Sequence, residues 1–155
     1  MHPSLLSAFL GTALALSVVA AHADPARHDA SRNVPVTALQ FGATGVTDAT
    51  GKALLAAPAY GDLSKGPHGT FIRMPAGFAS VVHRHHADYW GVVISGVAVN
   101  ATPQMAEQAS PLPAGSYWFQ KGDEAHVTRC ISATECVFFI SQQGAFDYTA
   151  DTHAH

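Results

Sequence analysis

The stretch from Gly77 to Gly96 constrains this chain most, because it sets three histidines, His83, His85 and His86, between two glycines and ahead of an apolar, β-branched run. Such runs favour strands. Side chains alternate along a strand with a period of two residues, so His83 and His85 would project from one face, about 6.5–7 Å apart along it. Two imidazoles at that spacing can converge on one metal ion. A solvated loop is the alternative interpretation.

The spacing resembles the first motif of the cupin superfamily. That motif runs glycine, five residues, His, any residue, His, three or four residues, Glu, six residues and glycine. Gly77, His83, His85 and Gly96 stand in register with it. The chain departs from the motif at the acidic position, which holds Tyr89.

A second cupin motif follows further along the chain. It runs glycine, five residues, Pro, any residue, Gly, two residues, His, three residues and Asn. Counting from Gly115 puts His126 on the motif's histidine. Lys121 replaces the proline, the inner glycine comes one place early at Gly122, and Cys130 takes the asparagine position. A His-x-His pair followed by a third histidine in register is a more specific signal than the pair alone.

The resemblance covers about residues 66–148 and is strongest to small, single-domain, ChrR-like cupins. It implies an all-β fold, a single-domain cupin-type jelly-roll barrel. The residues agree, since short strands divided by Gly and Pro turns are typical of a sandwich or barrel. We assign the cupin β-barrel domain to residues 36–150 and a polar C-terminal tail to 151–155.

The alternation of apolar and polar residues locates the individual strands. The segment 42–51 has the composition of a turn, and 52–60 fits either a short strand or a helical turn. No helix of any length is indicated. Strands are expected at 36–41, 70–74, 81–85, 89–94, 97–101, 116–119, 125–131 and 137–141.

The N-terminus has the features of a secretory signal peptide at residues 1–23. An uncharged apolar run from Leu5 to Ala21 leads into the small-x-small site Ala21-His22-Ala23. A membrane anchor is the alternative, but about seventeen apolar residues is marginal for a span. We therefore expect cleavage, a flexible segment at 24–35, a periplasmic or secreted location, and no stable membrane association after cleavage.

Charged residues make up only 12% of the chain, and the formal net charge is −3. The eight Lys and Arg residues are scattered without a basic stripe, so the composition gives no support to nucleic acid as a partner. Low charge with 48% hydrophobic residues predicts a covered surface, as in a homodimer. An Ala-rich composition is the alternative explanation.

The two cysteines, Cys130 and Cys136, flank a short segment that resembles a hairpin turn. In an exported protein, an even and closely spaced pair favours a disulfide. Metal binding by Cys130 is the alternative. Four residues of strand separate it from His126, about 13 Å, which is too far to share an ion.

By the resemblance, His83, His85 and His126 form a mononuclear metal site. Three neutral imidazoles and an open position suit one divalent transition metal ion: Zn, Fe, Cu, Ni or Mn. Without the motif's carboxylate, the site carries one more positive charge and should accept an anionic ligand more readily.

Four further residues have candidate roles at this site. Tyr89 could donate a hydrogen bond to a ligand or be a distant fourth ligand, and otherwise packs. Arg73 could clamp a carboxylate if it faces the barrel, and is otherwise a surface charge. Asp88 could accept from an imidazole or lie on the surface, and His86 is a reserve ligand.

Other side chains are expected around the site without a direct role. We expect His68 to be exposed in its Gly-Pro loop. Aromatic residues are expected near the mouth of the barrel: Tyr60, Phe71, Trp90 and Trp118.

Two classes of function compete. One is a metal-dependent oxygenase, isomerase or lyase acting on a small organic compound, carboxylate or diketone-like, as small-molecule substrate. The other is a catalytically silent periplasmic module that binds a metal or small ligand. The sequence contains no motif for a nucleophilic Ser or Cys and no phosphate-binding loop. This argues for chemistry other than nucleophilic catalysis or phosphate binding.

Overall fold

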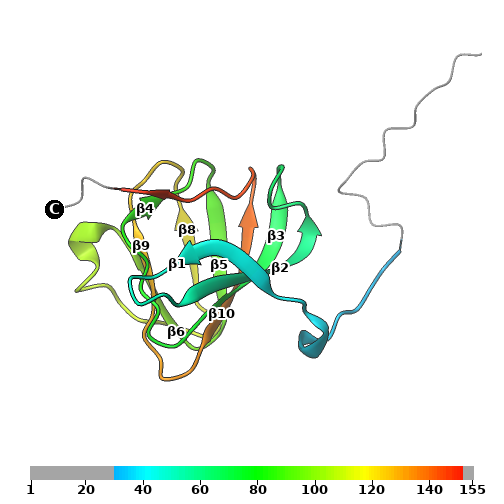
Figure 1. Cartoon of the computed structure of the whole chain (residues 1–155), viewed down its shortest axis with the longest axis horizontal. Helices are drawn as coiled ribbons and strands as arrows, with labels where there is room; N and C mark the ends of the chain where they lie inside the picture. Colours follow the sequence, from blue (N-terminus) through cyan, green and yellow to red (C-terminus); the bar gives the residue numbers. More distant parts are fainter. Residues whose placement is uncertain (1–29, 152–155) are drawn as a thin grey trace, which may run out of the picture.

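The computed structural model describes residues 30–151, which form an almost entirely β structure (Figure 1). The regions predicted as signal peptide, 1–23, and most of the C-terminal tail lie outside the described residues. Two short 3₁₀ turns, η1 (Val36–Ala38) and η2 (Pro103–Met105), are the helical elements of the described part. No helix within residues 30–151 is long and apolar enough to cross a membrane.

The larger sheet has six antiparallel strands in the order β1-β2-β3-β10-β5-β8. Strands distant in sequence are therefore neighbours, as the pairing of β10 with both β3 and β5 shows. The bounds are β1 Gly42–Thr47, β2 Ala53–Gly61, β3 His68–Met74, β5 Tyr89–Ser95, β8 Tyr117–Gln120 and β10 Cys136–Gln142.

Two smaller sheets complete the fold. One has the order β7-β6-β9, with β6 at Val97–Ala101, β7 at Leu112–Pro113 and β9 at Val127–Cys130. The other pairs β4, His83–Arg84, with β11, Thr149–Ala150.

A single hydrophobic core joins the sheets. It contains Ile72 and Phe138 of the larger sheet together with Ala98 and Cys130 of the three-stranded sheet. Period-two alternation fixes which side chains enter it: on β5, Val93 is buried while its neighbours point outward. The expected all-β jelly roll is confirmed.

The first predicted strand is displaced along the chain. Residues 36–38 form η1, and the strand β1 lies in the segment expected to be a turn. Pairing with β2 and a hydrogen bond from Thr44 Oγ1 to the Leu54 carbonyl (2.9 Å) overcome the weak strand propensity of that segment. Gly45, at φ 87°, accommodates the register shift in β1.

The turn is confined to the residues after β1. Asp48 carboxylate accepts hydrogen bonds from the backbone N–H groups of Thr50 and Lys52. Residues 53–61 then form β2, so the ambiguous segment is a strand.

A disulfide joins Cys130 and Cys136, with their Cα atoms 5.7 Å apart. Cys130 ends β9 and Cys136 begins β10, so the bond links the three-stranded sheet to the six-stranded sheet. Cys130 is therefore not available as a metal ligand.

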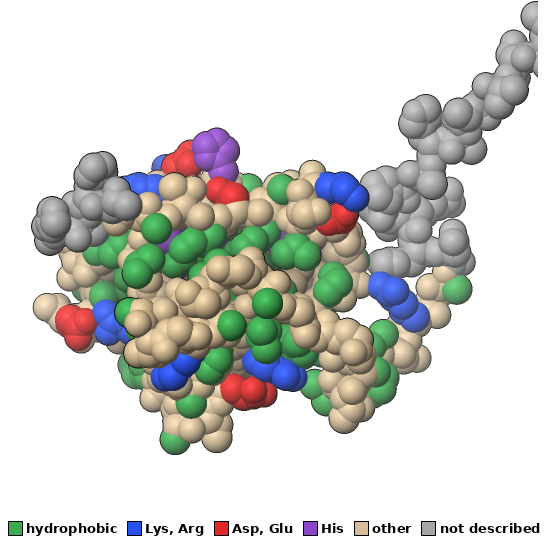
Figure 2. All heavy atoms as spheres, in the orientation of Figure 1, with side chains coloured by type: hydrophobic (Ala, Val, Ile, Leu, Met, Phe, Trp, Pro, Cys, Tyr) green, Lys and Arg blue, Asp and Glu red, His purple; other side chains and the backbone are tan. Residues whose placement is uncertain are grey.

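Charged side chains are dispersed over the surface. Figure 2 shows Lys, Arg, Asp and Glu as separate groups at the edges of one face, with hydrophobic side chains gathered between them. That face has no basic stripe, as the sequence predicts.

Candidate metal centre

Three histidines meet inside the fold. His83 lies on β4, His85 follows that strand, and His126 immediately precedes β9. One ring nitrogen from each lies within 4.8 Å of the other two. All three side chains are buried, with His126 only 1% exposed. The fold therefore brings together the three residues that the two sequence motifs place far apart.

Backbone pairing produces this convergence. His83 and His126 form an isolated antiparallel bridge in which each N–H donates to the other's carbonyl at 3.0 Å. Their ring centroids are 4.2 Å apart, and that of His85 lies 5.0 Å from His83 and 5.3 Å from His126. β4 is shorter than the expected strand at 81–85, and only His83 of the pair lies on it.

Each imidazole is oriented by a hydrogen bond from its Nδ1. His83 Nδ1 donates to the Val81 carbonyl at 2.9 Å, and His126 Nδ1 donates to the Glu124 carbonyl at 3.1 Å. His85 Nδ1 donates to the carbonyl of Asp147. A proton held on Nδ1 leaves Nε2 with its lone pair free to bind a metal ion.

Burial keeps the three imidazoles neutral. It lowers the pKa of His83 to about 3 and that of His126 to about 4, with the neighbouring histidines adding to the effect. The pKa of His85 is lowered too, again mainly by burial. Neutral imidazole is the form that binds a metal ion, so the donor set fits one divalent transition-metal ion.

Tyr89 occupies the position of the motif's carboxylate and lies beside the histidines. Its side chain is buried, and its hydroxyl donates to Nε2 of His126 at 3.3 Å. Burial raises the pKa of Tyr89 to about 12, so the hydroxyl keeps its proton at neutral pH. Tyr89 therefore contacts the very nitrogen that would bind the ion.

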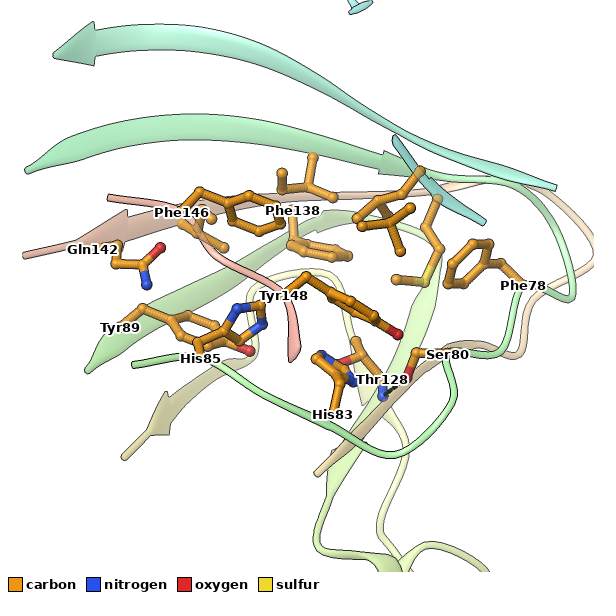
Figure 3. Close-up of a pocket in the computed structure, with 15 residues that line it drawn as sticks. Phe78, Ser80, His83, His85, Tyr89, Thr128, Phe138, Gln142, Phe146 and Tyr148 are labelled. Carbon is orange, nitrogen blue, oxygen red and sulfur yellow. Dashed lines mark hydrogen bonds between the residues drawn. The ribbon is translucent and has the colours of Figure 1, made fainter. Parts of the chain in front are cut away.

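A pocket opens from the histidines into the core (Figure 3). Its empty space is about 500 Å³ when the open solvent at its mouth is counted in. His83, His85 and Tyr89 line one part of it. The six-stranded sheet supplies an apolar wall made of Val46, Leu54, Ile72, Met74, Phe138 and Ile140.

The segment after β10 crosses the pocket, a feature that the sequence did not indicate. Phe146 and Tyr148 line the pocket, and the Tyr148 ring stacks on His83 with centroids 4.3 Å apart. The Asp147 carboxylate accepts from the backbone N–H of His86 at 3.0 Å. Short strand β11 then pairs with β4. The residues are unremarkable in sequence, and their role follows only from that pairing.

The other candidate residues near the motif lie outside the histidine cluster. Nδ1 of the exposed His86 ring lies 3.0 Å from a carboxylate oxygen of Asp123. Asp88 accepts a hydrogen bond from the backbone N–H of Gly122 at 2.6 Å rather than from an imidazole. Neither residue lines the pocket.

Arg73 lies off the pocket as well. Its guanidinium stacks over the Phe41 ring, 3.8 Å from the ring centroid, and lies 3.4 Å from the carboxylate of Glu135. Its neighbours on β3, Ile72 and Met74, line the pocket, so alternation directs Arg73 to the opposite face of the sheet. In this orientation Arg73 cannot clamp a ligand in the pocket.

The aromatic residues expected at the mouth are also elsewhere. Trp90 is exposed and packs on Phe119 of β8, and Trp118 is buried beside Phe138 in the core. Tyr60 and Phe71 both pack on Phe139. None of these four predicted mouth residues lines the pocket, because each points to the other side of its strand or into the core.

The expectation that His68 is exposed is wrong. Its ring is fully buried at the start of β3, where Nδ1 lies 2.8 Å from Thr70 Oγ1 and Nε2 lies 3.2 Å from Gln142 Oε1. Pairing of β3 with β10 sets Gln142 opposite His68 and closes this polar network.

Comparison with known families identifies the family to which the chain belongs. A family model described as a domain of unknown function, DUF4437, matches residues 50–155. The chain belongs to the DUF4437 family. The match spans both histidine motifs and the crossing segment, so the described site of this DUF4437 chain lies within it. No curated protein sequence matches the chain.

Solved structures resemble this DUF4437 chain in fold. An RmlC-like cupin from Shewanella frigidimarina has a TM-score of 0.56 at 14% identity, covering 76% of this chain and 95% of that one. The polyketide cyclase RemF from Streptomyces resistomycificus has a TM-score of 0.62 at 13% identity, covering 81% and 89%. The DMSP lyase DddQ from Ruegeria pomeroyi has a TM-score of 0.58 at 16% identity, covering 77% and 64%. The fold is that of the cupin superfamily.

Proposed function

We propose that this chain is an exported metal-binding cupin that holds one divalent transition-metal ion on His83, His85 and His126. The observation that carries the proposal is the convergence of three buried, neutral imidazoles whose Nδ1 atoms are each engaged by a backbone carbonyl. Such second contacts fix the ring orientation and the tautomer that metal binding requires.

The ion's ligand is a small organic compound, carboxylate or diketone-like, that enters the pocket beside the histidines. When bound, a divalent ion acts there as a Lewis acid toward an oxygen atom of that compound. The chain's own residues surround the compound with apolar walls, which exclude water, and Tyr89 holds a proton next to His126. The polyketide cyclase and the DMSP lyase that share the fold act on small molecules, by their names, which makes this use of the pocket reasonable.

A binding module without turnover is the second candidate. Among residues 30–151, those that line the pocket include no Asp, Glu or Lys to act as a general base, and burial raises the pKa of the two lining tyrosines, Tyr89 and Tyr148. This observation favours binding over proton-transfer chemistry.

The proposal is tested on the mature chain isolated from the periplasm. We expect about one metal ion per chain, found by elemental analysis, and retained at His83, His85 and His126 after gel filtration. Screening the loaded protein for turnover of small ketones and carboxylic acids then separates the two candidates: turnover favours the oxygenase, isomerase or lyase, and binding alone favours the module. Metal content well below one ion per chain, even after incubation with Zn²⁺, Fe²⁺, Cu²⁺, Ni²⁺ or Mn²⁺, would contradict the metal centre.

We also propose that the chain is exported, with residues 1–23 removed as a signal peptide. The Cys130–Cys136 disulfide supports an oxidising compartment, the periplasm or the exterior. Sequencing the N-terminus of the mature protein should give Asp24. Recovery of the full-length chain in the membrane fraction would favour an anchor instead.

Finally, we propose a homodimer formed through the outer face of β5 and β8. Large apolar side chains on that face are 40–73% exposed, and β8 is an edge strand of its sheet: Trp90, Val92, Ile94, Tyr117 and Phe119. Contiguous exposed apolar surface on a soluble protein marks an interaction site, and an edge strand has unpaired backbone groups to offer. A second copy would cover both.

A further inference from the structure

Among residues 30–151, no charged side chain lines the pocket beside the three histidines. Arg73, the one cation that the sequence offered for a carboxylate, lies on the opposite face of β3. The remaining lining is apolar apart from the histidines and a few hydroxyl and amide groups. A charge placed against these apolar walls loses its hydration and finds no counter-charge among the side chains of the lining. The walls therefore select the uncharged part of a ligand.

Most polar groups of the lining are already engaged within the protein. Thr128 Oγ1 donates to Asn100 Oδ1 at 2.8 Å, and Ser80 Oγ accepts from the backbone N–H of Thr128 at 2.9 Å. Gln142 bonds to His68 through one end of its amide and to the Ala87 carbonyl through the other. These groups therefore have limited hydrogen-bonding capacity left for a ligand.

Tyr148 is the exception. Within residues 30–151 its hydroxyl is a buried polar atom without a hydrogen-bond partner, and it is the one such atom that belongs to a residue of the pocket lining. Figure 3 shows the ring above His83 with the hydroxyl directed away from His85, toward the side where Phe78 and Ser80 lie. A buried hydroxyl without a partner is costly, and a ligand acceptor would satisfy it.

The backbone holds Tyr148 firmly in place. On one side, the Asp147 carbonyl accepts from His85 Nδ1. On the other, β11 pairs with β4, and the Asp151 N–H donates to the Val82 carbonyl at 2.8 Å. The ring also stacks on His83. A hydroxyl preorganised in this way can recognise an acceptor without an ordering cost on binding.

We propose that the pocket takes a small organic molecule with an uncharged, apolar body and an oxygen acceptor that receives a hydrogen bond from the Tyr148 hydroxyl. This inference rests on the proposed ligand-binding function and narrows it: among the carboxylate and diketone-like compounds, the protein's own side chains favour the neutral ketone class. Tyr148 is then a specificity-determining residue that neither cupin motif contains.

The test uses three probes with the same phenyl-and-chain body: the ketone 4-phenyl-2-butanone, the carboxylate 4-phenylbutyrate and the hydrocarbon butylbenzene. Binding to the full-length mature chain is measured by calorimetry or by ligand-observed NMR, on protein as isolated and on protein treated with a chelator. In the chelator-treated protein we expect the ketone to bind at least about tenfold more tightly than the carboxylate, since the cavity has no cation of its own.

Tyr148→Phe keeps the ring that stacks on His83 and removes only the hydroxyl. It should weaken ketone binding about tenfold, which is the order of one buried hydrogen bond, and change butylbenzene binding by less than about twofold. Tyr117→Phe is the matched control, because Tyr117 is 73% exposed on the outer sheet face, and it should change neither.

Two outcomes would overturn the inference: a carboxylate that binds as tightly as the ketone to chelator-treated protein, or a Tyr148→Phe protein that binds the ketone as wild type does. Absence of binding for all three probes would also count against it. Metal content, measured on the same preparations, tests the metal centre separately, because the comparisons above hold for protein without an ion.

Discussion

The backbones of His83 and His126 exchange two hydrogen bonds of 3.0 Å, although the two residues belong to different sequence motifs. This hydrogen-bonded antiparallel pair places the two imidazoles side by side, with ring centroids 4.2 Å apart. The third imidazole, that of His85, lies close to that of His83 because His85 is only two residues further along the chain. Most of the testable behaviour of the protein follows from this arrangement.

Removing one imidazole should empty the site. His126→Ala leaves two nitrogen ligands, so we expect bound metal to fall well below one ion per chain by elemental analysis. Because an ion that binds the folded state stabilises it, the melting temperature should also fall more for metal-loaded than for metal-free protein. His86→Ala is the control, since His86 is exposed and pairs with Asp123. Full occupancy in His126→Ala, with loss in His86→Ala, would contradict the assigned ligands.

Tyr89→Phe separates two roles for the tyrosine. Its hydroxyl donates to Nε2 of His126, the atom that the ion needs. Removing that competing hydrogen bond should leave one ion per chain and strengthen metal binding by up to roughly fivefold, the equivalent of about 1 kcal/mol. A competition titration against a coloured chelator measures this. Weaker binding in the variant would instead identify Tyr89 as a metal ligand.

The stability of metal-free protein should depend on pH through the buried histidines. The folded-state pKa values of His83 and His126, about 3 and about 4, lie below the ordinary value of 6.5. Below pH 6.5 the unfolded chain therefore binds protons that the folded chain does not. The stability is fully present above about pH 6.5 and is lost as the pH falls toward 4, at up to about 1.4 kcal/mol per pH unit for each histidine.

Urea unfolding of chelator-treated protein at pH 7.5, 5.5 and 4.5 measures this loss. The same series on His126→Ala is the control, since that variant should lose less stability between pH 7.5 and 4.5. Equal slopes in wild type and variant would show that His126 is not held neutral by burial.

Reduction of the disulfide should destabilise the fold without changing the metal site. The bond between Cys130 and Cys136 closes a short loop, so the chain-entropy model gives about 2 kcal/mol, or roughly 4–8 °C in melting temperature. The mature protein, unfolded without reductant, should show no free thiol. Cys130→Ser together with Cys136→Ser should still bind one ion per chain. Two free thiols in the unreduced protein would contradict both the bond and the case for export.

A charge on the outer sheet face should dissociate the proposed homodimer. Phe119 packs on Trp90 at a centroid distance of 5.1 Å on that face. We expect light scattering to give two chains per particle for wild type and one for Phe119→Lys. Ile131→Lys is the control, because Ile131 is exposed to the same extent, 49%, but lies in the loop between β9 and β10. A monomeric wild type would contradict the dimer.

The sequence by itself determined the β class, the three histidines that converge and the pairing of the cysteines. These features depend on local or pairwise properties: period-two alternation, glycine spacing, and the chemistry of imidazole and thiol. Such properties are the same in any fold that contains the motifs. The short first strand was misplaced because Gly42–Thr47 has weak strand propensity, and only its pairing with β2 makes it a strand.

The tertiary structure alone decided what surrounds the histidines. Arg73 and Trp90 differ from their pocket-facing neighbours only in the face of the strand that each occupies. A shift of the strand's pairing register by one residue moves each side chain to the opposite face. His68 is buried because β10 brings Gln142 beside it. Tyr148 enters the pocket because β11 pairs with β4, a contact between distant segments that no local pattern encodes. Long-range backbone pairing, which depends on the whole chain, therefore fixed the composition of the pocket.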